Sequence, residues 1–501
     1  MKINIFATSD LHGRIIPYDY GSNKKTKNSL ANLSTCYKLL KDENSILIDN
    51  GDVIKGSFLE RFVYDDKNPA IELMNYMGYD IWNLGNHEFN YGLDNIYRLV
   101  DNFKGQTLFA NSNGNFTPYT IIERSGYKIG FIGINTLLVN EFEGEYLGDF
   151  KVLDPVNIID DILESLSGRT HAIVGLFHLG ISDENGVKHA GIKSILDDLK
   201  NIDLLDLVIS GHTHDGFQEI VYKNVLITQP QSYGRSINKI SLEFEDKLVS
   251  KKAQAISSSL YEPDPTIVEF FEPYNKKILS YTNKVIGYLK NVSGDYNYDL
   301  DDGPLIHLLT EIMLHYYKAD VVAFQIDSIN TDLEDGPIRR SDIARLYTYS
   351  GGEVSLYKIK GEDLKAYINW SSNYYIYDGG LRLSPKRQSF KYKTFDIFGN
   401  INYCLDYGKE NRITELKRLD GSDIKDDDEL IIGMNEYRMN YLTSDKGPLS
   451  KKNFPQIASS NLILKDFPFH GTIRELAESY FENLPNNTFV YNGEKNFKIK
   501  Y

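Results

Sequence analysis

Short apolar runs rich in β-branched side chains recur along the first half of the chain and are typical of buried strands. Five of these runs end just before polar or titratable side chains; they cover residues 3–7, 46–48, 81–84, 172–176 and 207–209. Between the runs, apolar positions recur at helical spacing over residues 29–40, 69–77, 156–166 and 193–200. The alternation predicts an α/β domain that extends to about residue 255, with further strands over residues 226–228 and 237–244.

A set of five motifs follows the five strand-like runs. The motifs are Asp10-Leu11-His12, Gly51-Asp52, Gly85-Asn86-His87-Glu88, Phe177-His178 and Gly211-His212-Thr213-His214. In open α/β sheets the loops beyond the carboxyl ends of the strands form the ligand crevice, so the fold would bring these motifs together. Titratable groups at buried strand ends are costly unless a charged partner satisfies them. Imidazole and carboxylate together suit zinc, manganese, iron or nickel, and the set therefore predicts a metal site.

In their order, the motifs D-x-H, G-D, G-N-H-E, H and G-H-x-H resemble the calcineurin-like metallophosphoesterase family over about the first 250 residues. The resemblance implies a four-layer αββα sandwich, in which two mixed sheets face each other with helices outside. It also implies two divalent metal ions, chosen among manganese, zinc, iron, cobalt and nickel, and one bridging carboxylate. The positions carried over are Asp10, His12 and His214 for the first metal, Asp52 for the bridge, and Asn86, His178 and His212 for the second metal.

The resemblance implies that His87 binds no metal and instead protonates or stabilises the departing oxygen. This role suits a side chain that titrates near neutrality. Asn90 lies three residues further on, where many relatives that act on 5′-nucleotides have an Asp paired with the catalytic His. An Asn can orient an imidazole but does not stabilise its charged form as a carboxylate would. The run 85–94 instead resembles the bacterial 2′,3′-cyclic-nucleotide 2′-phosphodiesterase/3′-nucleotidase branch.

The second half of the chain has a different character. Residues 263–289 have a helical pattern with an aromatic stripe, which predicts a linker helix within residues 259–290 between a first domain over 1–258 and a second over 291–501. The second part resembles the 5′-nucleotidase C-terminal domain, an α+β substrate-binding domain that in relatives holds the base between two aromatic rings. The candidates for the two rings are Phe398 and Tyr437, and Phe395 could take the place of Phe398. Asn400 could contact either a base edge or the chain itself.

Length and composition limit the remaining alternatives. A chain of 501 residues with 41% hydrophobic and 25% charged residues is typical of a soluble protein of two domains. The net charge of −15 argues against a nucleic-acid polymer as partner, no run is long enough to span a membrane, and no obligate protein partner is evident. The sequence leaves no room for a secretory segment before the first strand, which predicts a cytoplasmic protein if Met1 is the native start and an extracytoplasmic one if a signal was removed.

These observations predict a hydrolase of small nucleotides with two metals, most specifically a 2′,3′-cyclic-nucleotide 2′-phosphodiesterase and 3′-nucleotidase. A 5′-nucleotidase or nucleotide-sugar hydrolase is the alternative, although residues 325–331 lack the glycine-rich stretch with Arg that is common in relatives specific for 5′-nucleotides. A hypothesis of another class is a nucleotide-binding module that has lost its chemistry. The intact metal set argues against this, and metal content would discriminate.

Overall fold

The computed structural model describes residues 1–142, 147–326, 332–347, 352–387, 393–460 and 471–501. Residues 327–331 of the segment discussed above therefore lie outside the described part. The chain divides into two compact units, Met1–Ile278 and Leu279–Tyr501. Among the described helices, none is both long and apolar enough to cross a bilayer. Cys36 and Cys404 are both free and buried.

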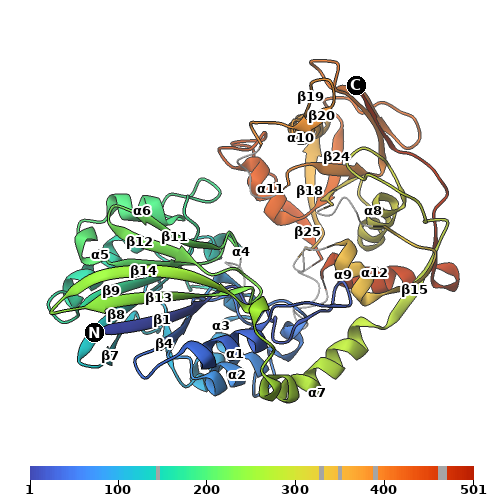
Figure 1. Ribbon diagram of the computed structural model, residues 1–501. Coiled ribbons are helices and arrows are strands. Elements are labelled where there is room, and N and C mark those ends of the chain that lie inside the picture. Colours follow the sequence, from blue (N-terminus) through green and yellow to red (C-terminus); the bar gives the residue numbers. More distant parts are fainter. Residues whose placement is uncertain (143–146, 327–331, 348–351, 388–392, 461–470) are drawn as a thin grey trace. The chain divides into compact units, whose positions relative to one another are not determined.

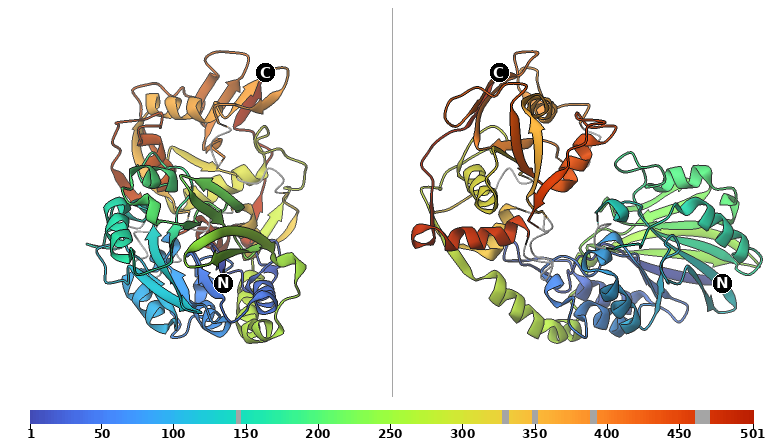
Figure 2. Two further views of the ribbon diagram at one scale, coloured as in Figure 1. Left: turned by 60° about the vertical axis from the view of Figure 1, so that its left-hand side comes forward. Right: turned by 180° about the vertical axis from the view of Figure 1, so that it is seen from behind.

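The first unit contains two six-stranded mixed sheets. The order in the first is β14-β13-β1-β4-β5-β6, in which β1, β4, β5 and β6 are parallel and β13 and β14 are antiparallel. Figures 1 and 2 show the long β13–β14 ribbon in green. The strands span Lys2–Thr8 (β1), Ile46–Asp49 (β4), Ile81–Asn83 (β5), Gln106–Leu108 (β6), Ser236–Phe244 (β13) and Leu248–Ser257 (β14).

The second sheet has the order β11-β12-β10-β9-β8-β7, with β8, β9, β10 and β12 parallel and one antiparallel strand at each edge. Its strands span Tyr119–Arg124 (β7), Tyr127–Asn135 (β8), Ala172–His178 (β9), Leu207–Ser210 (β10), Phe217–Tyr222 (β11) and Val225–Gln229 (β12). A small hairpin, β2 (Tyr18–Asp19) with β3 (Lys24–Lys25), lies apart from both sheets. All five predicted strands that precede a motif are therefore present.

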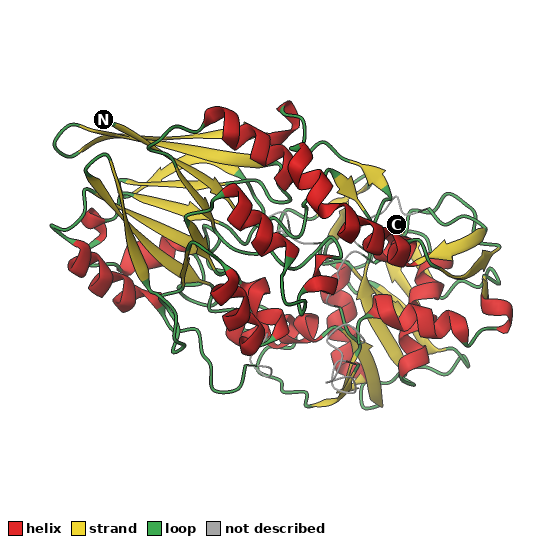
Figure 3. Cartoon of the chain, turned by 90° about the horizontal axis from the view of Figure 1, so that it is seen from below, coloured by secondary structure: helices red, strands yellow, loops and turns green. Residues whose placement is uncertain are grey.

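Alternate residues of both sheets share one buried cluster, which includes Ile5 and Ile48 from the first sheet and Val174 and Ile209 from the second. The two sheets therefore face each other, and helices cover their outer faces (Figure 3). On the second sheet these are α5 (Pro155–Leu166) and α6 (Ile192–Asp198), whose apolar residues pack on β8, β9 and β10. The other helices of this unit are α1 (Leu30–Leu40), α2 (Pro69–Met77), α3 (Leu93–Asn102) and α4 (Val139–Phe142). The predicted αββα arrangement is confirmed.

Local signals fix where these helices begin and end. Ser29 caps α1 by accepting from the backbone N–H of Asn32 at 3.3 Å, and Asn68 caps α2 in the same way through Ala70 at 3.0 Å. Pro69 occupies the first turn of α2, where its missing N–H costs nothing. Gly78 ends α2 with a φ of 75°, a left-handed conformation that suits glycine.

The structure has a helix in the first part of the predicted linker segment and a strand at its end. Helix α7 spans Pro265–Thr282, and its side chains Ile267, Phe271 and Ile278 are buried. The helix does not continue to residue 289, because β15 (Val285–Lys290) pairs with two distant strands of the second unit. The apolar spacing around Val285 fits a helix, but long-range pairing overrides it. The boundary between the two units falls after Ile278, inside α7.

The second unit is α+β. Its main sheet has the order β21-β16-β24-β18-β25, and its smaller sheets are β17-β15-β26, β23-β22-β27 and β19-β20. The strands are Val321–Gln325 (β16), Gly336–Arg339 (β17), Ser355–Lys360 (β18), Tyr375–Tyr377 (β19), Leu381–Leu383 (β20), Asp396–Gly399 (β21), Ile401–Asp406 (β22), Ile413–Arg418 (β23), Glu429–Met434 (β24), Gln456–Ser459 (β25), Thr488–Val490 (β26) and Phe497–Lys500 (β27).

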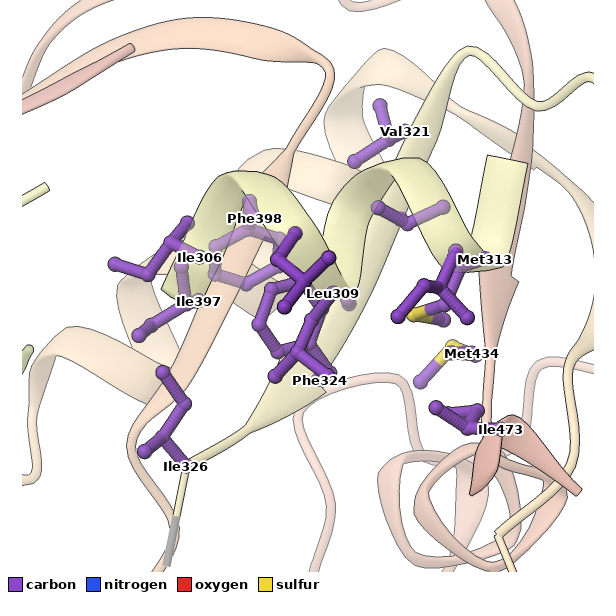
Figure 4. Packing of buried hydrophobic residues seen from close by; sticks show 14 of the residues in the cluster. Ile306, Leu309, Met313, Val321, Phe324, Ile326, Ile397, Phe398, Met434 and Ile473 are labelled. Atoms are coloured by element: carbon purple, nitrogen blue, oxygen red, sulfur yellow. The ribbon is translucent and has the colours of Figure 1, made fainter. Parts of the chain in front are cut away.

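The α-helices in the described part of this unit are Pro304–Tyr316 (α8), Arg340–Leu346 (α9), Gly361–Ser372 (α10), Glu436–Thr443 (α11) and Ile473–Glu482 (α12). Helix α8 packs on the main sheet through Leu309 and Met313, which Figure 4 shows beside Phe324 and Phe398. The unit thus has its own hydrophobic core.

Candidate metal centre

The five motifs lie at the carboxyl ends of strands from both sheets of the first unit. Asp10 follows β1, Asp52 follows β4 and Asn86 follows β5 in the first sheet. His178 is the last residue of β9, and the two histidines of the fifth motif follow β10 in the second sheet. Because the sheets face each other, these ends meet, and the structure brings together all seven residues that the sequence predicts as metal ligands.

The first group consists of Asp10, His12 and His214, whose ligand atoms lie within 4.8 Å of one another. The Nε2 atoms of His12 and His214 are 2.8 Å apart, and Nε2 of His214 is 3.3 Å from Oδ1 of Asp10. The other ring nitrogen of His12 is 3.0 Å from the carbonyl oxygen of Lys55. That contact leaves Nε2 of His12 as the ligand atom, an arrangement typical of metal-binding histidines.

The second group consists of Asp52, His178 and His212, again within 4.8 Å. Nε2 of His178 lies 3.0 Å from Oδ2 of Asp52, and Nδ1 of His212 lies 2.8 Å from Oδ1 of Asn86. Asn86 therefore lies beside this group, and its role as a ligand stays a prediction. Nδ1 of His178 is 2.6 Å from the carbonyl oxygen of Asn50, which orients the ring.

The position of Asp52 fits a bridging carboxylate. Its Oδ2 atom is 4.0 Å from Nε2 of His12 in the first group and 3.0 Å from Nε2 of His178 in the second. Its Oδ1 atom accepts a hydrogen bond of 2.8 Å from the backbone N–H of His87. One oxygen is thereby fixed while the other faces both groups. The ligand roles themselves stay a prediction.

Three observations indicate that these residues fit cations. Nε2 of His178 is fully buried 3.0 Å from Oδ2 of Asp52, yet the two groups do not meet hydrogen-bond geometry, and such a contact calls for an explanation. Left-handed backbone conformations, which cluster at functional sites, occur at Asp10, His12, Asp52, His212 and His214. A Cβ atom on Gly85 would lie 2.3 Å from Oδ1 of Asp52, so only glycine permits this close approach.

The electrostatics of the centre favour positive charge. Burial alone would raise the pKa of Asp10 and Asp52, but their histidine neighbours hold both below the usual range, so both carboxylates stay ionised. Burial alone would lower the pKa of His178, but Asp52 and Asp10 raise it to about 10. The protein thus balances its buried carboxylates with a proton on His178. Divalent cations would displace that proton, as metal binding generally does.

His87 and Asn90 lie on one short 3-10 turn, Asn86–Tyr91. Nδ1 of His87 is 2.8 Å from Oδ1 of Asn90, which can only accept, so Nδ1 carries the proton. The ring of His87 packs at a 66° angle against that of His12, with 5.4 Å between centroids. Burial, followed by the charge of Lys55, lowers the pKa of His87 to about 3, which makes the ring neutral.

Glu88 is a supporting residue that the motif contained but whose role only the structure reveals. Its carboxylate is fully buried and accepts backbone hydrogen bonds from Asp52 at 2.9 Å, Val53 at 2.8 Å and Gly85 at 2.8 Å, with a longer one from Ile54 at 3.4 Å. It therefore ties the loop after β4 to the loop after β5 and holds Asp52 in place.

Replacing Glu88 with Ala is expected to destabilise the protein by at least about 3 kcal/mol, because each buried N–H left without a partner costs about 1–3 kcal/mol. Thermal unfolding of the metal-free protein measures this, with the exposed Glu43→Ala as the matched control. Glu88→Gln keeps one acceptor oxygen and should lie between the two. An unfolding temperature for Glu88→Ala equal to that of Glu43→Ala would disprove the supporting role.

A second residue outside the motifs reaches the centre. Nε2 of His212 lies 3.0 Å from Oε2 of Glu184, while Nδ1 of the same ring faces Asn86. Carboxylate partners of this kind fix the orientation of a ligating imidazole. Glu184 stands in an acidic loop with no motif around it, so the sequence carried no signal that identified it.

The base-clamp candidates lie in the second unit, and the structure does not bring them together as open ring faces. Phe398 is 2% exposed and packs edge-on against Tyr367 with 4.9 Å between centroids, as part of the core in Figure 4. Phe395 is 3% exposed. A base can stack only on an accessible face, so this arrangement gives the two phenylalanines no support, and their role stays a prediction.

Tyr437 and Asn400 have different surroundings. Tyr437 is half-buried in the first turn of α11, where its backbone N–H donates to the capping Asn435 at 3.0 Å. Asn400 forms a turn with a φ of 66°, and its Nδ2 donates to the carbonyl oxygens of Ala319 at 3.0 Å and Asp320 at 3.3 Å. Of the two contacts considered for Asn400, the structure contains the one with the chain.

Comparison with known families assigns both units. The calcineurin-like phosphoesterase family matches residues 3–216, and the family described as 5′-nucleotidase, C-terminal domain, matches residues 285–443. The chain thus joins a calcineurin-like phosphoesterase domain to a 5′-nucleotidase C-terminal domain. It is therefore a metal-dependent phosphoric ester hydrolase, and its fold implies divalent metal ions at the centre described above.

Individual relatives are distant in sequence. A 2′,3′-cyclic-nucleotide 2′-phosphodiesterase/3′-nucleotidase of Haemophilus influenzae is 25% identical over 94% of this metallophosphoesterase and 81% of its own length. The trifunctional nucleotide phosphoesterase YfkN of Bacillus subtilis is 23% identical over 89% of this chain, which spans only 36% of that longer protein. A Staphylococcus aureus structure described as a 5′-nucleotidase superposes over 100% of both chains, with a TM-score of 0.83 at 18% identity, and supports the fold alone.

Proposed function

We propose that this metallophosphoesterase hydrolyses phosphate esters of small nucleotides, and specifically that it acts as a 2′,3′-cyclic-nucleotide 2′-phosphodiesterase and 3′-nucleotidase. The observation that carries the finer assignment is the pairing of His87 with Asn90 at 2.8 Å, in place of the Asp expected in relatives that act on 5′-nucleotides. The name of the Haemophilus influenzae relative supports the same assignment.

Each group of residues has a part in this reaction. Asp10, His12 and His214 would hold one divalent cation, Asn86, His178 and His212 the other, with Asp52 between them. When bound, such a pair lowers the pKa of a water molecule and neutralises the charge of the phosphate. The protein positions these ligands rigidly, so little reorganisation is needed during the reaction.

His87 would act on the leaving oxygen. Asn90 fixes its Nδ1–H, so Nε2 is the atom that exchanges a proton with the substrate. The negative charge of the phosphate ester beside the ring favours the protonated imidazole, because a nearby negative charge stabilises it. The proton then passes from Nε2 to the departing ester oxygen of the sugar, which leaves as a neutral hydroxyl group.

The first test compares initial hydrolysis rates of 2′,3′-cyclic AMP, 3′-AMP and 5′-AMP with manganese supplied. We expect the cyclic diester and the 3′-ester to turn over fastest, and a chelator to abolish all three activities. A preference for 5′-AMP would overturn the finer assignment and make the protein a 5′-nucleotidase.

Metal content separates this proposal from a binding module without turnover. The protein purified without chelators is expected to contain two divalent ions per chain by elemental analysis, because each of the two groups brings together three residues that could hold an ion. One or no ion per chain, together with nucleotide binding and no hydrolysis, would instead support a binding module.

A further inference from the structure

A cationic cluster lies beside the first group of metal ligands and is not used by the mechanism above. Its centre is Tyr233, whose ring centroid is 5.3 Å from that of His12 and 5.5 Å from that of His214. The backbone N–H of Tyr233 donates to the carbonyl oxygen of Asp10 at 2.8 Å. Tyr233 has a φ of 58°, which is rare for a bulky residue and is held by that hydrogen bond.

Two arginines flank this ring. The Cζ atom of Arg14 is 5.8 Å from the centroid of Tyr233, and that of Arg235 is 5.3 Å away. Both distances fall within the range of cation–π attraction. The ring therefore gathers two guanidinium groups next to the ligands of the first metal, in a protein whose net charge is −15.

Several hydrogen-bond donors in the side chains of this cluster make no hydrogen bond within the described residues. Arg235 is exposed, and its side chain forms no hydrogen bond or ion pair within the described residues, as is also true of the hydroxyl group of Tyr233. Nε of Arg14 is buried without a partner. Its Nη1 donates to the carbonyl oxygen of Tyr18 at 2.9 Å, and its Nη2 is 4.0 Å from Asp19, too far for a hydrogen bond.

We propose that Arg14, Tyr233 and Arg235 form a subsite for a second phosphate group of the substrate, in addition to the phosphate that is hydrolysed. Planar guanidinium groups match phosphate oxygens in pairs of hydrogen bonds, and a tyrosine hydroxyl adds one donor. The subsite rests on the proposed nucleotidase function and names a substrate class for it: nucleotides with two separate phosphates, such as a nucleoside 3′,5′-bisphosphate.

The test measures kcat/KM for adenosine 3′,5′-bisphosphate and for 3′-AMP in the wild-type protein and in Arg235→Gln. Arg235 is exposed, so its replacement should leave the fold intact, and circular dichroism checks this. We expect the wild type to prefer the bisphosphate. Arg235→Gln should reduce the ratio of the two kcat/KM values by about tenfold or more, the loss produced by removing a charge-assisted hydrogen bond, mainly through KM.

Two further variants sharpen the test. Arg235→Lys keeps the charge but loses the paired geometry, so its ratio should fall between those of the wild type and Arg235→Gln. Arg169→Gln is the matched control, because Arg169 is exposed and precedes β9, at the strand end opposite to His178. It should leave both rates and the ratio unchanged.

Several outcomes would overturn the subsite. One is an equal ratio in the wild type and Arg235→Gln. Another is inhibition by inorganic phosphate that depends on Arg235 without any preference for the bisphosphate, since the cluster would then bind free phosphate rather than substrate. A different result would contradict the nucleotidase proposal itself: the protein would hydrolyse p-nitrophenyl phosphate but neither of the two nucleotides.

Discussion

Replacing His87 with Asn is expected to lower kcat for 3′-AMP by roughly 10²–10⁴-fold, the usual contribution of a general acid. Metal binding should persist, because the contact of residue 87 with Asp52 is through its backbone N–H, 2.8 Å from Oδ1, and does not need the imidazole. Steady-state kinetics and metal analysis on the same preparation measure both effects.

The matched control is His171→Asn. His171 is exposed and precedes β9, so it lies at the strand end away from the metal centre, and its substitution should leave kcat unchanged. A kcat for His87→Asn that stays within a few-fold of the wild type, with both metals bound, would show that His87 does not serve the leaving group.

Replacing Asp52 with Asn is expected to disturb both metals at once. Oδ2 of Asp52 faces His12 at 4.0 Å and His178 at 3.0 Å, so a neutral amide removes negative charge from both groups. Loss of a residue that only hydrogen-bonds to a metal ligand lowers metal affinity by about 10–100-fold, and loss of a bridging ligand should lower it further. Competition with a chelator of known affinity gives the change, and turnover should fall with occupancy.

An exposed carboxylate provides the comparison for this variant. Asp246→Asn removes the same charge on the surface of the first unit and should change neither metal affinity nor turnover. If Asp52→Asn retained two tightly bound ions and full activity, Asp52 would not be the bridge. Should only one ion be lost while the other keeps its affinity, Asp52 would belong to a single group.

The sequence by itself determined the first unit and its centre to a large extent. Strands and helices there alternate with clear periods, and β1, β4 and β5 run parallel, so their carboxyl ends must share one edge of a sheet. The motifs at these ends then had to converge. The motifs also carry the resemblance to the calcineurin-like metallophosphoesterase family, and this resemblance assigned the seven residues from Asp10 to His214 to two metal sites.

Only the tertiary structure decided the features that depend on long-range contacts. Residues 285–290 fit a helix by spacing but form β15, because strands 336–339 and 488–490 offer it hydrogen-bond partners. The burial of Phe398 follows from the packing of α8 on β21, which the pattern around it does not encode. The same reason applies to Glu184 and to the cluster around Tyr233. Their neighbours are close in space and remote in sequence, and local periodicity carries no record of such pairs.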